Sequence, residues 1–410
     1  MKNLKGRCVF AQSGGPTAVI NASIAGGVLQ ALKEENVTGV LCANHGVKGV
    51  LSEDFFDMEK EETSELLALK STPASAFGSV RYKLKDEKED DTDYKRILEV
   101  FKKYDVRYFF YNGGNDSMDT CAKISAYMKK SGYDVNVIGI PKTIDNDLAG
   151  TDHCPGYGSA AKYIATTITE INRDAEIYES PLVIIVEIMG RNAGWLTAAA
   201  ELASLTGYGA DLIYLPEIPF SVDKFKADVA YILKKRGKCV VAVSEGIRYE
   251  NGGYVGEDKT AADVFGHSAL GGVCGYLKSV VKSTGVKCKA IELNILQRCA
   301  AHIASETDVN EAFEVGRQAV IKAVAGETDE MVSIKRKKGV KYEVLFDAEP
   351  LEKAANAEKK IPLSWIKQSG TGLTEEFIDY ALPLISGENE RRIKDGLPSY
   401  AKLKLEKFRL

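Results

Sequence analysis

Two carboxylates stand two residues apart in the run from Pro141 to Asp147, PKTIDND. In an extended loop, Asp145 and Asp147 would point the same way. One could then accept a proton while the other helps to hold Mg²⁺, which prefers oxygen ligands. An alternative is an Asx-rich turn without a chemical function, which is a common use of Asp-Asn-Asp. The run therefore indicates a site for proton transfer beside a metal ion, unless the turn is purely structural.

Two pairs of adjacent glycines, Gly14-Gly15 and Gly113-Gly114, each follow a strand-like run. Because glycine has no Cβ, the backbone N–H groups of such a pair can close on a phosphate, and a helix that begins there favours the anion through its dipole. Either pair alone could be only a tight turn between a strand and a helix. Two pairs, each expected to open a helix, favour a binding site for a phosphate donor.

Short runs rich in β-branched and aromatic residues recur along the chain, each followed by polar or glycine-rich residues and a segment of helical period. The runs are Val9–Ala11, Arg107–Tyr111, Val135–Ile140, Leu182–Val186, Leu212–Tyr214 and Val240–Val243. Their nearly continuous hydrophobicity predicts an α/β fold, with parallel strands covered by helices on both faces. Ligands in such folds bind beyond the carboxyl ends of the strands, which is where the polar clusters occur.

The length of 410 residues predicts two domains with a cleft between them. A formal net charge of −4 argues against nucleic acid or an anionic membrane as the main partner. No apolar stretch approaches the ~20 residues of a membrane span, and the first residues lack the pattern of a signal peptide. We therefore expect a cytoplasmic protein whose eight scattered cysteines are free, buried thiols.

The segments SGG, GGNDS, PKTIDND, MGR, SEG and LQR, in this order, resemble the phosphofructokinase family, and within it the pyrophosphate-dependent branch. The resemblance implies Mg²⁺-dependent, reversible phosphoryl transfer from pyrophosphate to the C1 hydroxyl of fructose 6-phosphate. With the strand pattern it predicts two Rossmann-like, three-layer domains with mostly parallel sheets. We expect a donor domain over 1–156, rejoined by about 297–347, a sugar-phosphate domain over 157–296, and a C-terminal extension over 348–410.

On the acceptor side, the resemblance makes Asp145 the base that takes the proton from the sugar hydroxyl. It also implies that Thr143 and Asp145 contact the sugar and that Asp147 lies toward the metal. The element Met189-Gly190-Arg191 would bind the substrate, with its arginine stabilising the charge on the transferring group. These roles suit phosphoryl transfer, which depends on positioning and on neutralising charge.

Three further residues are assigned to the sugar phosphate by the resemblance. Glu245 would contact a sugar hydroxyl, and Arg298 would bind the 6-phosphate. Lys289 stands where relatives often have an arginine that reaches into the neighbouring subunit's site, so the resemblance implies a homodimer or homotetramer. A lysine can still meet a phosphate, although as a point charge without bidentate geometry.

Two positions concern the donor, because ATP-dependent relatives have glycine where this chain has Asp116 and Lys142. Asp116 would place a carboxylate where the nucleotide α-phosphate should lie, and Lys142 would add a cation near the transferred group, so both favour pyrophosphate. The alternatives are a surface lysine and a helix N-cap formed by Asp116 or Ser117. In the resemblance Arg81 corresponds to a donor-phosphate arginine, although an arginine beside the charged run 81–92 could simply be solvated.

Other donor-site residues follow from the same motifs: Gly14, Gly15, Gly114 and Asn115. Asn115 is a departure, because the family usually has a metal-binding aspartate there. Its amide oxygen can still bind Mg²⁺ but brings no charge, so Asp147 or Asp116 would carry more of the coordination.

Three other functions remain open on the sequence. One is an ATP-dependent enzyme with the same acceptor. Another is a sugar-phosphate-binding regulatory subunit without catalysis, which Asn115 could indicate. The third, a nucleotide or lipid kinase with a similar glycine-rich loop, is disfavoured by Arg191, Glu245 and Arg298.

Overall fold

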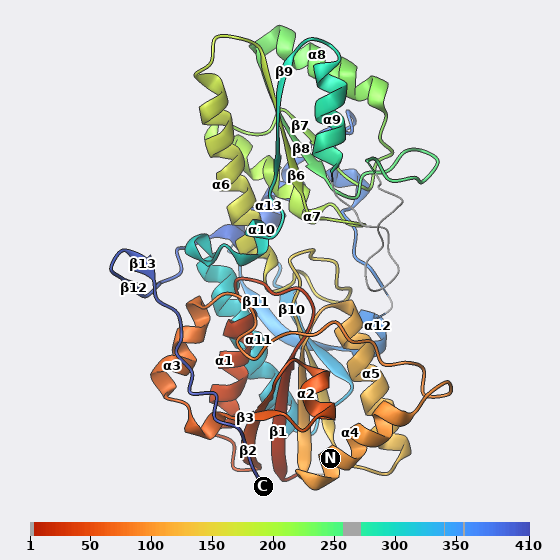
Figure 1. Cartoon of the computed structure of the whole chain (residues 1–410), viewed down its shortest axis with the longest axis vertical. Helices are drawn as coiled ribbons and strands as arrows, with labels where there is room; N and C mark the ends of the chain where they lie inside the picture. The colour runs from red at the N-terminus through yellow and green to blue at the C-terminus, as the bar shows by residue number, and fades with distance from the viewer. Residues whose placement is uncertain (1–3, 257–271, 340, 356) are drawn as a thin grey trace.

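The computed structural model describes residues 4–256, 272–339, 341–355 and 357–410. Over these residues the chain forms two sheets of seven and four strands, and a short two-stranded hairpin. Figure 1 shows the larger sheet in the lower part of the molecule and the smaller sheet above it. Loops that follow the strands of each sheet lie between the two sheets (Figure 1).

The larger sheet has the strand order β11-β10-β5-β4-β1-β2-β3, and only the edge strands β3 and β11 run antiparallel to their neighbours. Its strands are β1 (Gly6–Gln12), β2 (Val37–Ala43), β3 (Phe55–Asp57), β4 (Val106–Gly113), β5 (Asn136–Pro141), β10 (Glu330–Arg336) and β11 (Val344–Pro350). The late strands β10 and β11 extend a sheet that the N-terminal segment begins. The chain therefore returns to this sheet after building the smaller one.

Helices cover both faces of the larger sheet. Because successive side chains of a strand point to opposite faces, neighbouring residues pack on different layers of helices. Phe10 packs with the helices of one face, and Val9 with those of the other. The first face carries α1 (Ile20–Ala31), α3 (Thr63–Ala68) and α11 (Glu306–Val324). The second carries α2 (Val47–Leu51), α4 (Thr92–Lys103), α5 (Asn115–Lys130) and α12 (Leu351–Ala355). This is a three-layer arrangement.

The smaller sheet is wholly parallel and has the order β7-β8-β6-β9. Its strands are β6 (Leu182–Ile188), β7 (Leu212–Tyr214), β8 (Lys238–Ser244) and β9 (Lys287–Glu292). One face packs on α6 (Tyr157–Glu176), α7 (Trp195–Ala198) and α13 (Glu375–Ala381), and the other on α8 (Val222–Arg236) and α9 (Val273–Lys282). It too is three-layered.

The C-terminal segment runs over both parts of the molecule. Helix α13 packs beside the smaller sheet, and the chain then passes through the hairpin β12 (Ile393–Lys394) and β13 (Leu397–Pro398). It ends beside the larger sheet, where the Phe408 N–H donates to the oxygen of Phe55. Figure 1 shows both chain ends at the foot of the larger sheet.

The predicted fold class is confirmed. Five of the six predicted runs lie within a strand, and the sixth, Val135–Ile140, lies in β5 except for Val135. The prediction that all cysteines are buried is wrong for Cys299, which is exposed, whereas the other seven are buried and all eight are free thiols. Among the described residues, no helix has the length and apolar character needed to cross a bilayer.

Candidate active site

A cavity of about 410 Å³ lies where loops from the two sheets meet. The loops follow β1, β4 and β5 of the larger sheet and β6 and β8 of the smaller one, at the carboxyl ends of the strands. All the predicted site residues line this cavity except Gly190 and Lys289. Those that do are Gly14, Gly15, Arg81, Gly114, Asn115, Asp116, Lys142, Thr143, Asp145, Asp147, Met189, Arg191, Glu245 and Arg298.

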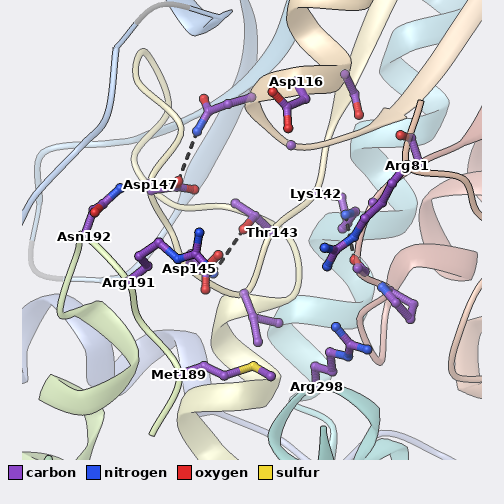
Figure 2. A pocket seen from close by; sticks show the side chains of 18 of the residues that line it. Arg81, Asp116, Lys142, Thr143, Asp145, Asp147, Met189, Arg191, Asn192 and Arg298 are labelled. Carbon is purple, nitrogen blue, oxygen red and sulfur yellow. Dashed lines mark hydrogen bonds between the residues drawn. The ribbon is translucent and has the colours of Figure 1, made fainter. Parts of the chain in front are cut away.

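Side chains alternate along the loop that follows β5. Thr143, Asp145 and Asp147 face the cavity and are partly exposed, whereas Asn146 between the two carboxylates is fully buried. The Asn146 side chain donates to the hydroxyl of Tyr380 at 2.7 Å and accepts from the N–H of Cys154 at 2.9 Å. Asn146 has a φ of 55°, in the left-handed region that asparagine tolerates. This anchor places both carboxylates on the cavity side (Figure 2).

The carboxyl groups of this loop lie in an acidic, poorly solvated setting. Desolvation and then the neighbouring Glu245 raise the pKa of Asp145, which Lys142 partly opposes. Desolvation and then Asp145 raise the pKa of Asp147. A bound cation would relieve this repulsion, and raised carboxyl pKa values are typical of groups that exchange protons near neutral pH.

Lys142 lies inside the donor side of the cavity, with only 3% of its surface exposed. Its Nζ donates a 2.7 Å hydrogen bond to the oxygen of Gly15, and burial lowers its pKa to about 8. The alternative of an ordinary surface lysine is therefore wrong.

The glycine pair after β1 leaves room for two cations. A Cβ on Gly14, whose φ is 76°, would lie 3.2 Å from the Lys142 Nζ, and a Cβ on Gly15 would lie 2.9 Å from a guanidinium nitrogen of Arg298. These glycines let the backbone approach both side chains. The pair does not open a helix as expected, since α1 begins only at Ile20, whereas the second pair does because Gly114 is the N-cap of α5.

Asp116 is exposed at the mouth of the donor side and lies in the first turn of α5. The N-cap alternative is wrong, because Gly114 occupies the cap position and no side chain caps it. The guanidinium of Arg81 extends toward Lys142 from the facing loop (Figure 2). This end of the cavity thus combines a helix N-terminus, two cations and one carboxylate.

The acceptor side is formed by the loops after β6 and β8 and by the short helix α10 (Leu296–Cys299). Gln297 accepts a 3.3 Å hydrogen bond from the Met189 N–H, which holds α10 against the loop that carries Arg191. Glu245 accepts from the Gly190 N–H at 3.4 Å, so Gly190 supports the wall without lining it. In Figure 2, Arg191 lies beside Asp145, whereas Arg298 lies below Lys142 and Arg81.

The residues near Asp147 fit a divalent metal ion. The Asn115 amide nitrogen donates to Asp147 at 3.0 Å, which turns its oxygen away from that carboxylate. This Oδ1 atom is buried and has no hydrogen-bond partner among the described residues. An amide oxygen and a carboxylate are ligands that hard cations prefer, and the Asn115 oxygen would share a cation with Asp147 once its amide group turned over.

Lys289 does not reach the cavity of its own chain. It lies on β9 with its Nζ 3.9 Å from an Asp174 carboxylate and 5.1 Å from the centre of the Tyr178 ring.

Several residues that line the cavity were not predicted. Tyr82 and Lys83 belong to the charged run that was expected to be a solvated loop, and Asn192 directly follows the MGR element. Glu358 comes from the C-terminal extension. Tyr82 and Asn192 had a sequence signal, because each directly follows a predicted site residue, Arg81 or Arg191.

Comparison with known proteins identifies the family of this chain. Residues 7–322 match the family model described as Phosphofructokinase. The chain is 44% identical over 98% of both lengths to the pyrophosphate--fructose 6-phosphate 1-phosphotransferase of Halomonas elongata. It is 46% identical to that of Xanthomonas campestris over 97% of this chain and 96% of the relative. The crystal structure of a pyrophosphate-dependent phosphofructokinase from Nitrosospira multiformis superposes with a TM-score of 0.91 at 40% identity, covering 99% of this chain and 98% of that one. This chain belongs to the phosphofructokinase family.

Proposed function

We propose that this chain transfers a phosphoryl group from pyrophosphate to the C1 hydroxyl of fructose 6-phosphate, giving fructose 1,6-bisphosphate and phosphate. The observation that carries the proposal is the placement of Asp116 and Lys142 in one cavity with Asp145 and the acceptor-side arginines. Relatives that share more than 40% identity over nearly the whole chain bear the name of this activity. We expect the reaction to run in both directions, because pyrophosphate and fructose 1,6-bisphosphate, the phosphoryl donors of the two directions, transfer their phosphoryl groups with similar free energies.

Asp145 is the proposed base, and it accepts the proton of the sugar C1 hydroxyl as the phosphoryl group arrives. Its raised pKa moves its basicity toward that of a group working near neutral pH. Arg191 beside it stabilises the negative charge on the transferring group, while Met189, Gly190 and Thr143 shape the sugar site. We assign Glu245 to a sugar hydroxyl and Arg298 to the 6-phosphate.

Pyrophosphate is the proposed donor, bound at Gly14, Gly15 and Gly114 by the backbone N–H groups of Gly15 and Gly114 and by the cations Lys142 and Arg81. The Gly14 N–H itself donates to the Val80 oxygen at 3.3 Å. Because Lys142 is buried against the Gly15 carbonyl, its ammonium adds charge inside the cavity. Asp116, at the mouth of the donor side, repels the α-phosphate of a nucleotide by its charge and obstructs the ribose by its bulk. The ATP-dependent alternative is therefore disfavoured.

Enzymes of this family use a divalent metal ion, and we propose Mg²⁺ here. Asn115 through its free oxygen and Asp147 would hold it. When bound, the ion would neutralise charge on the donor phosphates. A bound cation would also favour the ionised form of Asp147, against the desolvation and the Asp145 charge that raise its pKa.

We propose further that residues 1–156 with 297–347 bind the donor, that 157–296 bind the sugar phosphate, and that 348–410 extend over both. The strands of the two sheets follow this division closely. We also propose a cytoplasmic homodimer or homotetramer, in which Lys289 reaches the site of a neighbouring chain.

A matrix of donors and acceptors tests the proposal. The purified chain should form fructose 1,6-bisphosphate from fructose 6-phosphate with pyrophosphate and Mg²⁺, and chelation of the metal should stop it. Activity with ATP alone would support the ATP-dependent alternative. Binding of fructose 6-phosphate without turnover of any donor would support a non-catalytic subunit.

A further inference from the structure

The C-terminal extension contributes a brace to the active site. Its residues Glu358 to Ile361 lie against the loop after β5 and the loop after β6, which belong to different sheets. This segment lies beyond residue 322, where the match to the phosphofructokinase model ends.

The main chain of Lys359 joins the two site loops directly. The Lys359 N–H donates to the main-chain oxygen of Asp147 at 2.7 Å. The Lys359 carbonyl accepts from the indole N–H of Trp195 at 2.8 Å. Trp195 lies four residues after Arg191, at the end of the MGR loop. One residue of the extension therefore fixes the spacing between the carboxylate loop and the arginine loop.

A second link lies two residues further along. Glu217 accepts hydrogen bonds from the N–H of Gly194 at 2.8 Å and from the N–H of Ile361 at 3.3 Å, through the same carboxylate oxygen. Ile361 is 2% exposed and packs in the core of the smaller sheet. The brace is thus anchored at its far end by buried apolar contact.

The side chain of Lys359 holds the carboxylate loop from behind. Its Nζ donates to the main-chain oxygen of Asp152 at 2.7 Å, and lies 3.3 Å from the oxygen of Thr151 and 3.4 Å from the Oδ1 of Asn146. An ammonium group has three donors, so all three bonds can form at once. The loop has little regular structure of its own to satisfy these carbonyls.

Tyr380 of the same extension supports the same loop independently. Its hydroxyl donates to the Asp152 oxygen at 2.8 Å and accepts from the amide of Asn146 at 2.7 Å. The Asp152 oxygen thus receives one bond from Lys359 and one from Tyr380. Asn146 stands between Asp145 and Asp147, so these anchors bear on the residues that face the cavity.

We propose that Lys359 is a positioning residue of this active site, which holds the Asp145–Asp152 loop in register with the Arg191 loop. The expected effect on the reaction rate rests on the proposed function. Phosphoryl transfer is sensitive to such register, since a displacement of about 1 Å can cost on the order of 100-fold in rate. The fold does not depend on this one ammonium, because Ile361 and α13 pack in the core.

The test compares Lys359→Met with Lys359→Arg and with Lys360→Met, whose side chain is exposed and adjacent. In Lys359→Met we expect kcat to fall about tenfold or more in both reaction directions, with KM for both substrates within about threefold. Lys359→Arg should recover part of kcat because it retains donors, and Lys360→Met should match the parent. kcat is therefore expressed per active site, because a loss of folded protein would lower the unfolding midpoint and the active fraction but would leave kcat per active site at the parental value.

Tyr380→Phe keeps the ring and removes only the hydroxyl. It is the second variant for testing the anchoring of the same loop if Lys359→Met does not fold. It should lower kcat with KM unchanged. Amide hydrogen exchange across residues 145–152 should also be faster in whichever variant folds, and this readout needs no substrate. Parental kcat and parental exchange in these variants would overturn the inference, whereas absence of pyrophosphate-dependent activity in the parent would overturn only the proposed function.

Discussion

The Nζ atom of Lys142 donates a 2.7 Å hydrogen bond to the main-chain oxygen of Gly15. This bond joins the loop after β5 to the loop after β1, across the intervening strand β4. It directs an ammonium group into the space where the glycine pair leaves room for a phosphate. The donor side of the site depends on this relationship.

Burial lowers the pKa of Lys142 to about 8, which predicts a pH dependence. The ammonium form is the one that attracts pyrophosphate, so kcat/KM for pyrophosphate should decline as the pH rises through about 8. Lys142→Arg should lack this decline, because a guanidinium stays protonated over this pH range. Its overall rate should be lower than that of the parent. The same decline in both proteins would mean that another group, or the donor itself, titrates.

Exchange of the donor-side residues should alter donor preference. Replacing both Asp116 and Lys142 by glycine removes the repelling carboxylate and the buried ammonium. The ratio of kcat/KM for ATP to that for pyrophosphate should rise by more than about tenfold. Asp119→Asn is a matched control, because it removes a carboxylate from the same helix that pairs with Lys123 instead of facing the cavity. An unchanged ratio in the double variant would refute the role of these residues.

Asp145→Asn should abolish most of the catalysis while leaving the shape of the site intact. Loss of a general base typically costs about 10²- to 10⁴-fold in kcat. The KM for fructose 6-phosphate should change little, because the amide can still contact the sugar. Steady-state kinetics in both directions measure this, with the exposed Asp379→Asn as control. A kcat within tenfold of the parent would assign the proton transfer elsewhere.

Lys289 provides a test of a shared site, since it does not line the cavity of its own chain. We expect Lys289→Ala to raise KM for fructose 6-phosphate. At fructose 6-phosphate concentrations far below the KM of Lys289→Ala, mixing Lys289→Ala chains with Asp145→Asn chains should give about a quarter of the parental activity in a homodimer, because hybrid dimers contain one complete site. No recovery in hybrids of confirmed composition would show that each chain supplies its own residues.

His153 predicts a pH dependence of stability. Its ring lies between Asp152 at 2.8 Å and Glu311 at 2.6 Å and is buried. Burial alone would lower the pKa of this imidazole, but Glu311 and Asp152 raise it to about 9 from an ordinary value of 6.5. Its contribution to the free energy of unfolding is therefore full below pH 6.5 and lost as the pH rises through about 9.

Urea unfolding at several pH values measures this effect. The contribution is at most about 3 kcal/mol, as the pKa difference implies. His153→Gln should lower the unfolding midpoint at acid pH and flatten its decline between pH 6.5 and 9. The exposed His302→Gln should behave as the parent. An undiminished decline in His153→Gln would contradict the assignment.

The sequence predicted the parts of the molecule whose signals are local. Central strands such as β4 and β6 are buried on both faces, so their continuous hydrophobicity is visible in the sequence. Among the described residues, five strands of the seven- and four-stranded sheets lay outside the predicted runs: β2, β3, β9, β10 and β11. Of the edge strands, β3 has only three residues, and β9 and β11 are partly exposed along their length. The interior strands β2 and β10 were missed because Thr38-Gly39 and Ser333 interrupt their apolar runs. Cys299 is the last residue of the short helix α10, and its exposure could not be read from residue type.

The site was predictable where chemistry is concentrated in short motifs. Asp145, Lys142 and Arg191 are such cases, and the structure brings them together. Lys359 was not, because a lone lysine in a tail without motifs gives no indication of contacts made more than two hundred residues away in sequence. Such long-range hydrogen bonds depend on the folded path of the chain.

The ratio of kcat/KM for pyrophosphate to kcat/KM for ATP, measured at saturating fructose 6-phosphate and Mg²⁺, tests the central claim most directly. The account predicts that pyrophosphate is preferred by more than about 100-fold, because Asp116 and Lys142 together shape the cavity for a small polyanion. Equal use of ATP by the unaltered protein would contradict it.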